Sequence, residues 1–173
     1  EVVTQLIYGE SFSIIKKTNK WLKIKIKEDG YKGFIKNKNF IPFIKPTHKI
    51  NKLKANYFKF HNTKIKMNEL SLGSKIKIID KRFGFLKFHN GWIKLNDVKP
   101  IAYKEKDFFK KIRIFKNVKY IWGGKSFKGI DCSGLIQVVL NFNNKYCPRD
   151  AKDQINLFKR NIKLSDIKKN DII

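Results

Sequence analysis

The 173 residues suit one ordinary domain or two to three very small ones, and 42% hydrophobic residues are enough to bury a core, which excludes wholesale disorder. The formal net charge of +26 invites a nucleic-acid interpretation. However, all but four of the 40 basic residues are lysines, whereas arginine is the residue that forks onto phosphate and guanine, so we expect no specific nucleic-acid binding.

Attraction to an anionic envelope polymer is a secondary alternative. The longest apolar runs are far too short for a membrane span, and no signal peptide opens the sequence, so we expect no transmembrane segment. The two cysteines, Cys132 and Cys147, are not spaced as metal ligands or as a Cys-x-x-Cys pair. We therefore expect no metal, no cofactor and no disulfide scaffold.

Short strands separated by turn residues dominate the first hundred residues, with expected strands over 2–7, 12–15, 21–26 and 31–35. In the third of these, lysines alternate with apolar residues, which predicts a solvated face opposite a buried one. A weak internal repeat follows, because Gly73 and Gly91-Trp92-Ile93 correspond to Gly9 and Gly33-Phe34-Ile35. This pattern predicts two small barrels over 1–45 and 46–101, with Trp21 and Trp92 in their cores.

Helical periodicity begins after Pro100, and we expect helices around 108–116, from Asp131 to about Phe142, and after Pro148. Arg149 and Asp150 are expected to form a local ion pair or cap. Residues 164–173 indicate a polar turn that enters a strand.

Cys132 follows Asp131 at the predicted helix start, in the run Asp131-Cys132-Ser133-Gly134. The helix dipole and the unpaired amides there stabilise negative charge, as a nucleophilic thiol requires. The same amides could hold an oxyanion. A small buried cysteine at a helix start is the structural alternative, and spacing alone does not separate the two. For Cys147 we favour the buried alternative.

Several motifs in order resemble the NlpC-type cell-wall cysteine peptidases, and the resemblance covers residues 103–173. They are Tyr120-x-Trp122-Gly123-Gly124, Asp131-Cys132-Ser133-Gly134-Leu135, Pro148-Arg149-Asp150 and Gln154. The preceding units resemble bacterial SH3-like domains, on the stretches Thr4-Gln5 to Gly9-Glu10, Trp21 and Asp29-Gly30-Tyr31-x-Gly33. The implied fold is two SH3-like barrels followed by an α+β papain-like peptidase domain over 102–173, incomplete at its C-terminus.

The resemblance implies hydrolysis of peptidoglycan stem peptides at the bond between gamma-D-glutamate and a diamino acid, with Cys132 as nucleophile. Asp131 would hold the free ammonium of an N-terminal L-alanine, while Ser133 and Tyr120 would line the pocket or support the oxyanion. Glu10 and Tyr31 would close the pocket from the first SH3-like unit. Ordinary strand surface is the alternative for those two residues.

Two departures from the family pattern stand out. Ala151 occupies a position where many relatives have Ser. All three histidines (His48, His61 and His89) precede Cys132, whereas the family's base follows the nucleophile. We therefore expect the sequence to be part of a longer enzyme and to be inactive alone. The alternative function is a non-catalytic protein that binds cell wall or peptides through SH3-like domains. The diamino acid, the oligomeric state and the compartment (bacterial cytoplasm or envelope) stay open.

Overall fold

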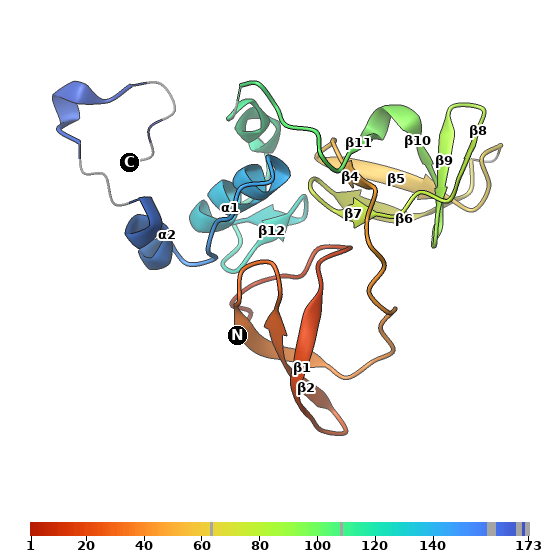
Figure 1. The fold of residues 1–173 in the computed structure, drawn as a ribbon, viewed down its shortest axis with the longest axis horizontal. Coiled ribbons are helices and arrows are strands. Elements are labelled where there is room, and N and C mark those ends of the chain that lie inside the picture. Colours follow the sequence, from red (N-terminus) through yellow and green to blue (C-terminus); the bar gives the residue numbers. More distant parts are fainter. Residues whose placement is uncertain (63, 108, 159–161, 169–170, 172–173) are drawn as a thin grey trace.

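The computed structural model describes residues 1–62, 64–107, 109–158, 162–168 and 171. Strands make up most of its regular structure, and the helices gather in the C-terminal third (Figure 1). Three hydrophobic clusters organise this part of the chain, one for each region that the sequence analysis distinguished. No helix in the described ranges is long and apolar enough to cross a membrane.

The first cluster lies under an antiparallel sheet in the order β1-β2-β3. The strands are β1 (Phe12–Lys17), β2 (Trp21–Ile26) and β3 (Lys32–Lys36). Along β2 the apolar residues Leu22, Ile24 and Ile26 are each 2% exposed while the residues between them face solvent, which confirms the predicted alternation. Trp21 belongs to the outer set and is 45% exposed, so the expectation that it fills a core was wrong.

The second cluster lies between a five-stranded sheet, β6-β5-β10-β9-β8, and a three-stranded sheet, β11-β4-β7. These strands are β4 (His48–Ile50), β5 (Lys54–Phe58), β6 (Lys66–Ser71), β7 (Lys75–Ile76), β8 (Asp80–Arg82), β9 (Phe85–Phe88), β10 (Gly91–Lys94) and β11 (Val98–Pro100), with a 3-10 turn, η1 (Leu95–Asp97), before the last. Trp92 is buried, as expected. One core shared by two small sheets explains why such short strands are stable.

The third cluster is formed mainly by helices. The elements of the C-terminal region are η2 (Lys110–Phe115), β12 (Lys125–Ser126), β13 (Gly129–Ile130), α1 (Cys132–Phe142), α2 (Ala151–Phe158) and η3 (Leu164–Asp166). Of these, η2, β13 and α1 contribute buried residues to the third cluster, together with Leu72 from the turn after β6. The predicted helices at 131–142 and after Pro148 are confirmed as α1 and α2. The helix expected around 108–116 is a 3-10 segment, and Phe108 lies outside the described residues. Most of the strand expected near residue 173 also lies outside them.

Residues 2–7 are not a strand, which corrects the sequence prediction. The Gln5 side chain accepts hydrogen bonds from the Lys125 amide and the Ser126 hydroxyl, each at 3.0 Å. The backbone at Val2 and Val3 packs against Gly123. The segment therefore makes hydrogen bonds to the C-terminal region instead of pairing with a neighbouring strand. In this way it connects the first sheet to that region.

The turns that carry the internal repeat contact each other. Gly9 has φ +86° and Gly73 has φ +81°, a conformation that favours glycine. The Lys75 amide donates to the Tyr8 carbonyl at 2.8 Å, and a side chain at Gly9 would collide with the Lys75 carbonyl. The turn before β1 therefore packs against the equivalent turn between β6 and β7, which joins the first sheet to the strands of the second cluster.

Candidate active site

Cys132 is exposed and is the first residue of α1. Asp131, just before it, has extended backbone (φ −102°, ψ 177°) and caps the helix, because its side chain accepts from the Gly134 amide at 2.7 Å. The first amides of a helix have no intrahelical partner, and together with the dipole they favour negative charge at this end. The thiol is therefore accessible in a place where a thiolate or an oxyanion is stabilised.

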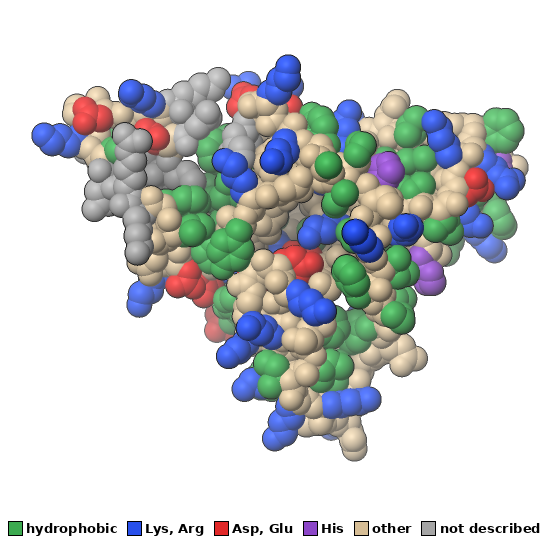
Figure 2. Space-filling model, in the orientation of Figure 1, with side chains coloured by type: hydrophobic (Ala, Val, Ile, Leu, Met, Phe, Trp, Pro, Cys, Tyr) green, Lys and Arg blue, Asp and Glu red, His purple; other side chains and the backbone are tan. Residues whose placement is uncertain are grey.

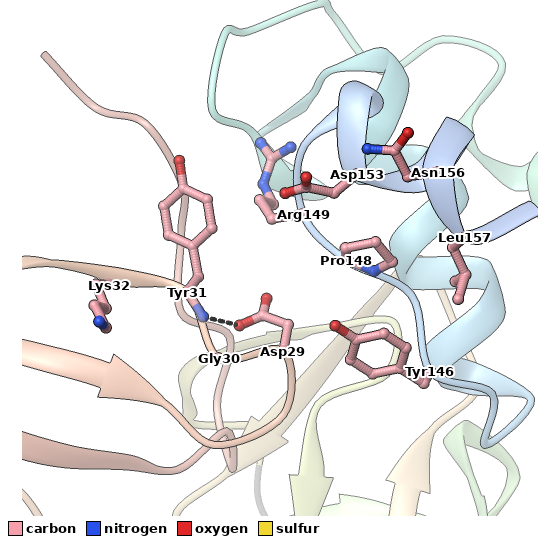
Figure 3. Close-up of a pocket in the computed structure, with 10 residues that line it drawn as sticks. All are labelled: Asp29, Gly30, Tyr31, Lys32, Tyr146, Pro148, Arg149, Asp153, Asn156 and Leu157. Carbon is pink, nitrogen blue, oxygen red and sulfur yellow. Dashed lines mark hydrogen bonds between the residues drawn. The ribbon is translucent and has the colours of Figure 1, made fainter.

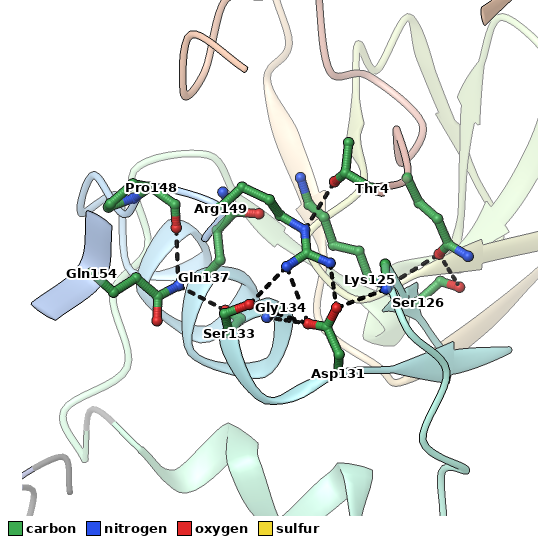
Figure 4. A network of polar contacts seen from close by, with 12 residues as sticks. Thr4, Lys125, Ser126, Asp131, Ser133, Gly134, Gln137, Pro148, Arg149 and Gln154 are labelled. Atoms are coloured by element: carbon green, nitrogen blue, oxygen red, sulfur yellow. Dashed lines mark hydrogen bonds and ion pairs between the residues drawn. The ribbon is translucent and has the colours of Figure 1, made fainter. Parts of the chain in front are cut away.

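A buried ion pair lies behind this helix end (Figure 4). The Arg149 guanidinium donates to both oxygens of Asp131, at 3.1 and 2.6 Å, and the Gly123 amide donates to the same carboxylate at 2.8 Å. Burial alone would raise the pKa of Asp131, but Arg149 and the amides of Gly134 and Gly123 outweigh burial and hold that pKa below its ordinary value. The carboxylate is 6% exposed and ionised.

Arg149 joins further residues to this pair. It donates from Nη1 to the Ser133 hydroxyl at 2.8 Å and from Nε to the Thr4 hydroxyl at 2.9 Å. Of the two predicted roles for Arg149 and Asp150, a local ion pair or a cap, the ion pair was wrong, since Asp131 is the ion-pair partner of Arg149. Thr4 was not predicted as part of the site. No motif signals it, because it reaches the site only through the fold.

Two glycines let the backbone close up around the carboxylate. A Cβ at Gly134 would lie 2.4 Å from the Gly124 carbonyl oxygen, and a Cβ at Gly123 would lie 2.6 Å from the Val2 carbonyl oxygen. Gly123 also has φ +72°. The Gly-Gly run of the motif is therefore explained by close backbone approach in this structure.

Tyr31 lines a cavity of about 580 Å³ between the β2–β3 turn and α2 (Figure 3). Burial, together with the negative charge of the nearby Asp150 carboxylate, raises the pKa of Tyr31. Arg149 also lines this cavity, and its guanidinium contacts Asp131 beside Cys132. Cys132 is not among the residues that line the cavity, and Arg149 and Asp131 lie between the cavity and the helix end that carries the thiol.

Asp29, from the same turn, fastens the first sheet to α1. Its side chain accepts from the Tyr31 amide at 2.9 Å and from the Gln137 amide nitrogen at 2.9 Å. Gln137 is fully buried and also donates to the Cys147 carbonyl at 3.1 Å. These bonds hold the wall that carries Tyr31 against the helix of Cys132.

Glu10 lies in a buried ion pair with Lys125, at 2.6 Å, and the two side chains are 4% and 1% exposed. Its other oxygen accepts from the Ile7 amide at 2.9 Å. Burial raises the pKa of Glu10, and the Lys125 ammonium offsets only part of that effect. In this structure Glu10 joins the first sheet to β12 and does not line the cavity that contains Tyr31.

Among the other predicted residues, Ser133 is buried and Tyr120 is exposed. The Ser133 carbonyl accepts from the Gln154 side chain at 2.9 Å (Figure 4), and Tyr120 bridges to Ile130 with its ring 62% exposed. The three histidines belong to β4, to the loop after β5 and to the turn between β9 and β10. Across the described residues no group of three or more His, Cys, Asp or Glu side chains could hold a metal ion.

Cys147 provides an internal contrast to Cys132. It is 0% exposed, and burial raises the pKa of its thiol to about 12. A buried, protonated thiol is unreactive. The structure therefore confirms the expectation for Cys147 and leaves Cys132 as the accessible thiol.

An exposed thiol at a helix N-terminus, supported by a buried ion pair, is the arrangement in which nucleophilic cysteines occur. Comparisons with known proteins agree with a cysteine-dependent enzyme. Residues 117–173 match the NlpC/P60 family, and residues 1–40 match the bacterial dipeptidyl-peptidase SH3 domain family. The chain therefore carries an NlpC/P60 peptidase domain together with a bacterial SH3 domain, as the sequence motifs predicted.

One curated relative is the gamma-D-glutamyl-L-lysine dipeptidyl-peptidase of Bacillus subtilis (strain 168), 26% identical over 189 residues. The match covers 99% of this chain and 63% of that protein. A crystal structure of an NlpC/P60 family protein from Bacillus cereus ATCC 10987 superposes with a TM-score of 0.77 at 22% identity, over 88% of this chain and 59% of the other. At that identity the likeness shows the fold alone.

Proposed function

We propose that Cys132 is the nucleophile of a cysteine peptidase that cleaves peptidoglycan stem peptides between gamma-D-glutamate and a diamino acid. The observation that carries the proposal is the exposed thiol at the start of α1, beside the buried Asp131–Arg149 pair. The name of the Bacillus subtilis relative supports the bond type. We also propose a papain-like arrangement, in which the nucleophile opens a helix that packs on a sheet, here represented by β12 and β13.

The proposed reaction has two steps. The Cys132 sulfur attacks the gamma-carbonyl carbon, and amides at the α1 start hold the resulting oxyanion. The carbon–nitrogen bond breaks, the diamino acid leaves with a proton from a general acid, and a thioester remains. Water then hydrolyses the thioester and restores the thiol. We propose that a histidine serves as proton donor and acceptor in this scheme. The three histidines of the given sequence, His48, His61 and His89, all lie in residues 46–101.

Asp131 is proposed to act on the substrate's N-terminal ammonium, with Tyr31 closing the cavity from the first sheet. The negative charge of Asp131 supports this role, although the Asp131 oxygens already accept hydrogen bonds from Arg149 and from two backbone amides. Ser133 and Tyr120 are proposed to line the pocket, and Glu10 to close it. The buried pairing of Glu10 with Lys125 means that this last role requires the pair to open on binding.

We further propose two SH3-like barrels over 1–45 and 46–101, followed by the peptidase domain over 102–173. The cluster of the first sheet lies wholly within residues 1–45, which supports the first boundary. The other two clusters are centred on 46–101 and 102–173, but Tyr8 packs against one and Leu72 is buried in the other, so the units also share core contacts. The alternative function, a non-catalytic protein that binds wall peptides, would use the same cavity without covalent chemistry.

The test is hydrolysis of L-alanyl-gamma-D-glutamyl-L-lysine by the gene product that contains these residues, followed by mass spectrometry of the released amino acid. Cys132→Ala is expected to abolish release, while Cys147→Ala, at the buried thiol, retains it. Release of the amino acid by the Cys132→Ala protein would overturn the assignment of Cys132 as the nucleophile. Binding of the peptide with no release by the unmodified protein would favour the non-catalytic alternative.

A further inference from the structure

A second cavity, of about 710 Å³, shares no lining residue with the Tyr31 cavity. Three segments form it: residues 53–54 at the start of β5, residues 113–119 at the end of η2 and after it, and residues 127–128 in the turn between β12 and β13. All of them lie in described ranges. The cavity is therefore a separate feature of the surface between the second and third clusters.

Cations dominate its lining. Five of the ten lining residues are basic and none is acidic: Lys54, Arg113, Lys116, Lys119 and Lys128. In the whole chain only 40 of 173 residues are basic, so this concentration exceeds the general lysine excess visible in Figure 2. Such an arrangement raises the local concentration of anions.

These cations are largely free of protein counter-ions. Lys54 has Glu69 at 3.2 Å, in an exposed pair. The other four have no carboxylate within ion-pair distance in the part of the chain that the structure describes. A ligand could therefore neutralise them without first breaking a buried ion pair.

Part of the cavity lining is apolar and continuous with the third hydrophobic cluster. Leu53, Ile114 and Val118 line the cavity and also pack against the third hydrophobic cluster. Phe127 is the one aromatic residue among the lining residues, and the Lys54 ammonium lies 5.7 Å from its ring centroid. A ring engaged in this way makes a poor platform for stacked bases.

We propose that this cavity binds an extended anionic polymer through its phosphate groups. Four of the five cations are lysines, which bind phosphate as point charges and need no fixed bidentate geometry, so they can neutralise a flexible chain of phosphates without reading a base sequence. This binding is independent of chemistry at Cys132, and it would hold the protein on a phosphate-bearing surface.

The test uses the full chain and fluorescently labelled inorganic polyphosphate, with anisotropy measured over a series of salt concentrations. Binding is expected to weaken linearly with the logarithm of salt concentration. The triple variant Lys116→Gln/Lys119→Gln/Lys128→Gln should lose at least about tenfold in affinity, and its salt slope should fall by about three, one for each phosphate contact removed.

The matched control is Lys16→Gln/Lys23→Gln/Lys36→Gln, which removes the same charge from exposed positions on β1, β2 and β3. It should change affinity less than about twofold if the contacts are local. Equal losses in the two triple variants, or no binding by the unmodified chain, would overturn the proposal. Circular dichroism checks that both variants are folded.

Two further arms identify the ligand chemistry. Poly-glutamate of similar charge should bind more weakly than polyphosphate, and tighter binding would overturn the phosphate assignment. A single-stranded oligonucleotide that binds more tightly than polyphosphate, and that loses affinity when Phe127 is changed to Ala, would replace the proposal with a nucleic-acid site. Cys132→Ala should bind polyphosphate unchanged.

Discussion

The Arg149 guanidinium donates to both oxygens of Asp131, and neither side chain is more than 7% exposed. Since Asp131 caps the helix that Cys132 opens, Arg149 fixes the backbone at the nucleophile from a loop 18 residues further along the chain. Arg149 also donates to the Thr4 hydroxyl, which connects the N-terminal segment to the same hydrogen-bond network. The position of the thiol therefore depends on three segments that are far apart in the sequence.

This relationship predicts that Arg149→Met is strongly destabilising. Asp131 would remain buried without its cation, and breaking one side of a buried pair costs about 3 to 5 kcal/mol. Urea unfolding followed by circular dichroism measures the change. Arg113→Met removes an exposed arginine and should change the free energy of unfolding by less than about 0.5 kcal/mol. Similar losses in both variants would show that the Asp131 pair contributes nothing specific.

The two cysteines should differ sharply in reactivity. Cys132 is exposed, while Cys147 is fully buried and has its pKa raised to about 12 by burial. At pH 8 iodoacetamide should modify Cys132 within minutes and leave Cys147 untouched until the chain is unfolded in denaturant. Peptide mass spectrometry over time distinguishes the sites. Slow or absent labelling of Cys132 in the folded chain would contradict the proposed nucleophile.

Alanine substitutions at Gly123 and Gly84 should distinguish the cost of backbone strain from the cost of a steric collision. Both have positive φ, +72° and +77°, but a Cβ at Gly84 meets nothing within 4 Å, whereas at Gly123 it would lie 2.6 Å from the Val2 carbonyl oxygen. Gly84→Ala should cost only about 1 to 2 kcal/mol from the left-handed conformation. Gly123→Ala should cost more, because the N-terminal segment must also move. Equal unfolding midpoints for the two variants would exclude the close packing of residues 2–3.

Local patterns in the sequence predicted much of this structure. The alternation in β2 and the capped helix at Asp131 depend on neighbouring residues only, and both were predicted with nearly correct bounds. Residues 2–7 also contain short apolar runs with β-branched residues, as strands do, yet tertiary contacts with Gly123, Lys125 and Ser126 replace the ladder. Periodicity does not reveal which surface a segment will meet.

The charged residues of the site were the hardest to assign. Nothing in a lysine-rich sequence marks Lys49 and Lys125, which are the two lysines among the described residues that are at most 2% exposed. Arg149 was predicted to form a local ion pair or cap with its neighbour Asp150, but its ion-pair partner in the fold is Asp131. Such pairings depend on how distant segments are packed, so they follow from three-dimensional structure rather than from spacing.

Lys49 should make stability depend on pH in the alkaline range. Its ammonium reaches the C-terminal end of α1, where it donates to the Phe142 carbonyl and to the Asn144 side chain. Burial, together with repulsion from Lys75 and Lys104, lowers its pKa from 10.5 to about 8. Between these two values the unfolded chain binds more protons than the folded chain, so this group makes the free energy of unfolding rise with pH, by up to about 1.4 kcal/mol per pH unit.

Urea unfolding between pH 8 and pH 10 tests this sign. The Lys49→Met protein should show a shallower rise in the free energy of unfolding than the unmodified chain, because the proton difference at this site is gone. Lys45→Met removes one lysine from an exposed position before β4 and serves as the matched control for total charge. A slope for Lys49→Met that equals the slope for Lys45→Met would mean that Lys49 keeps its proton throughout this range, despite its burial.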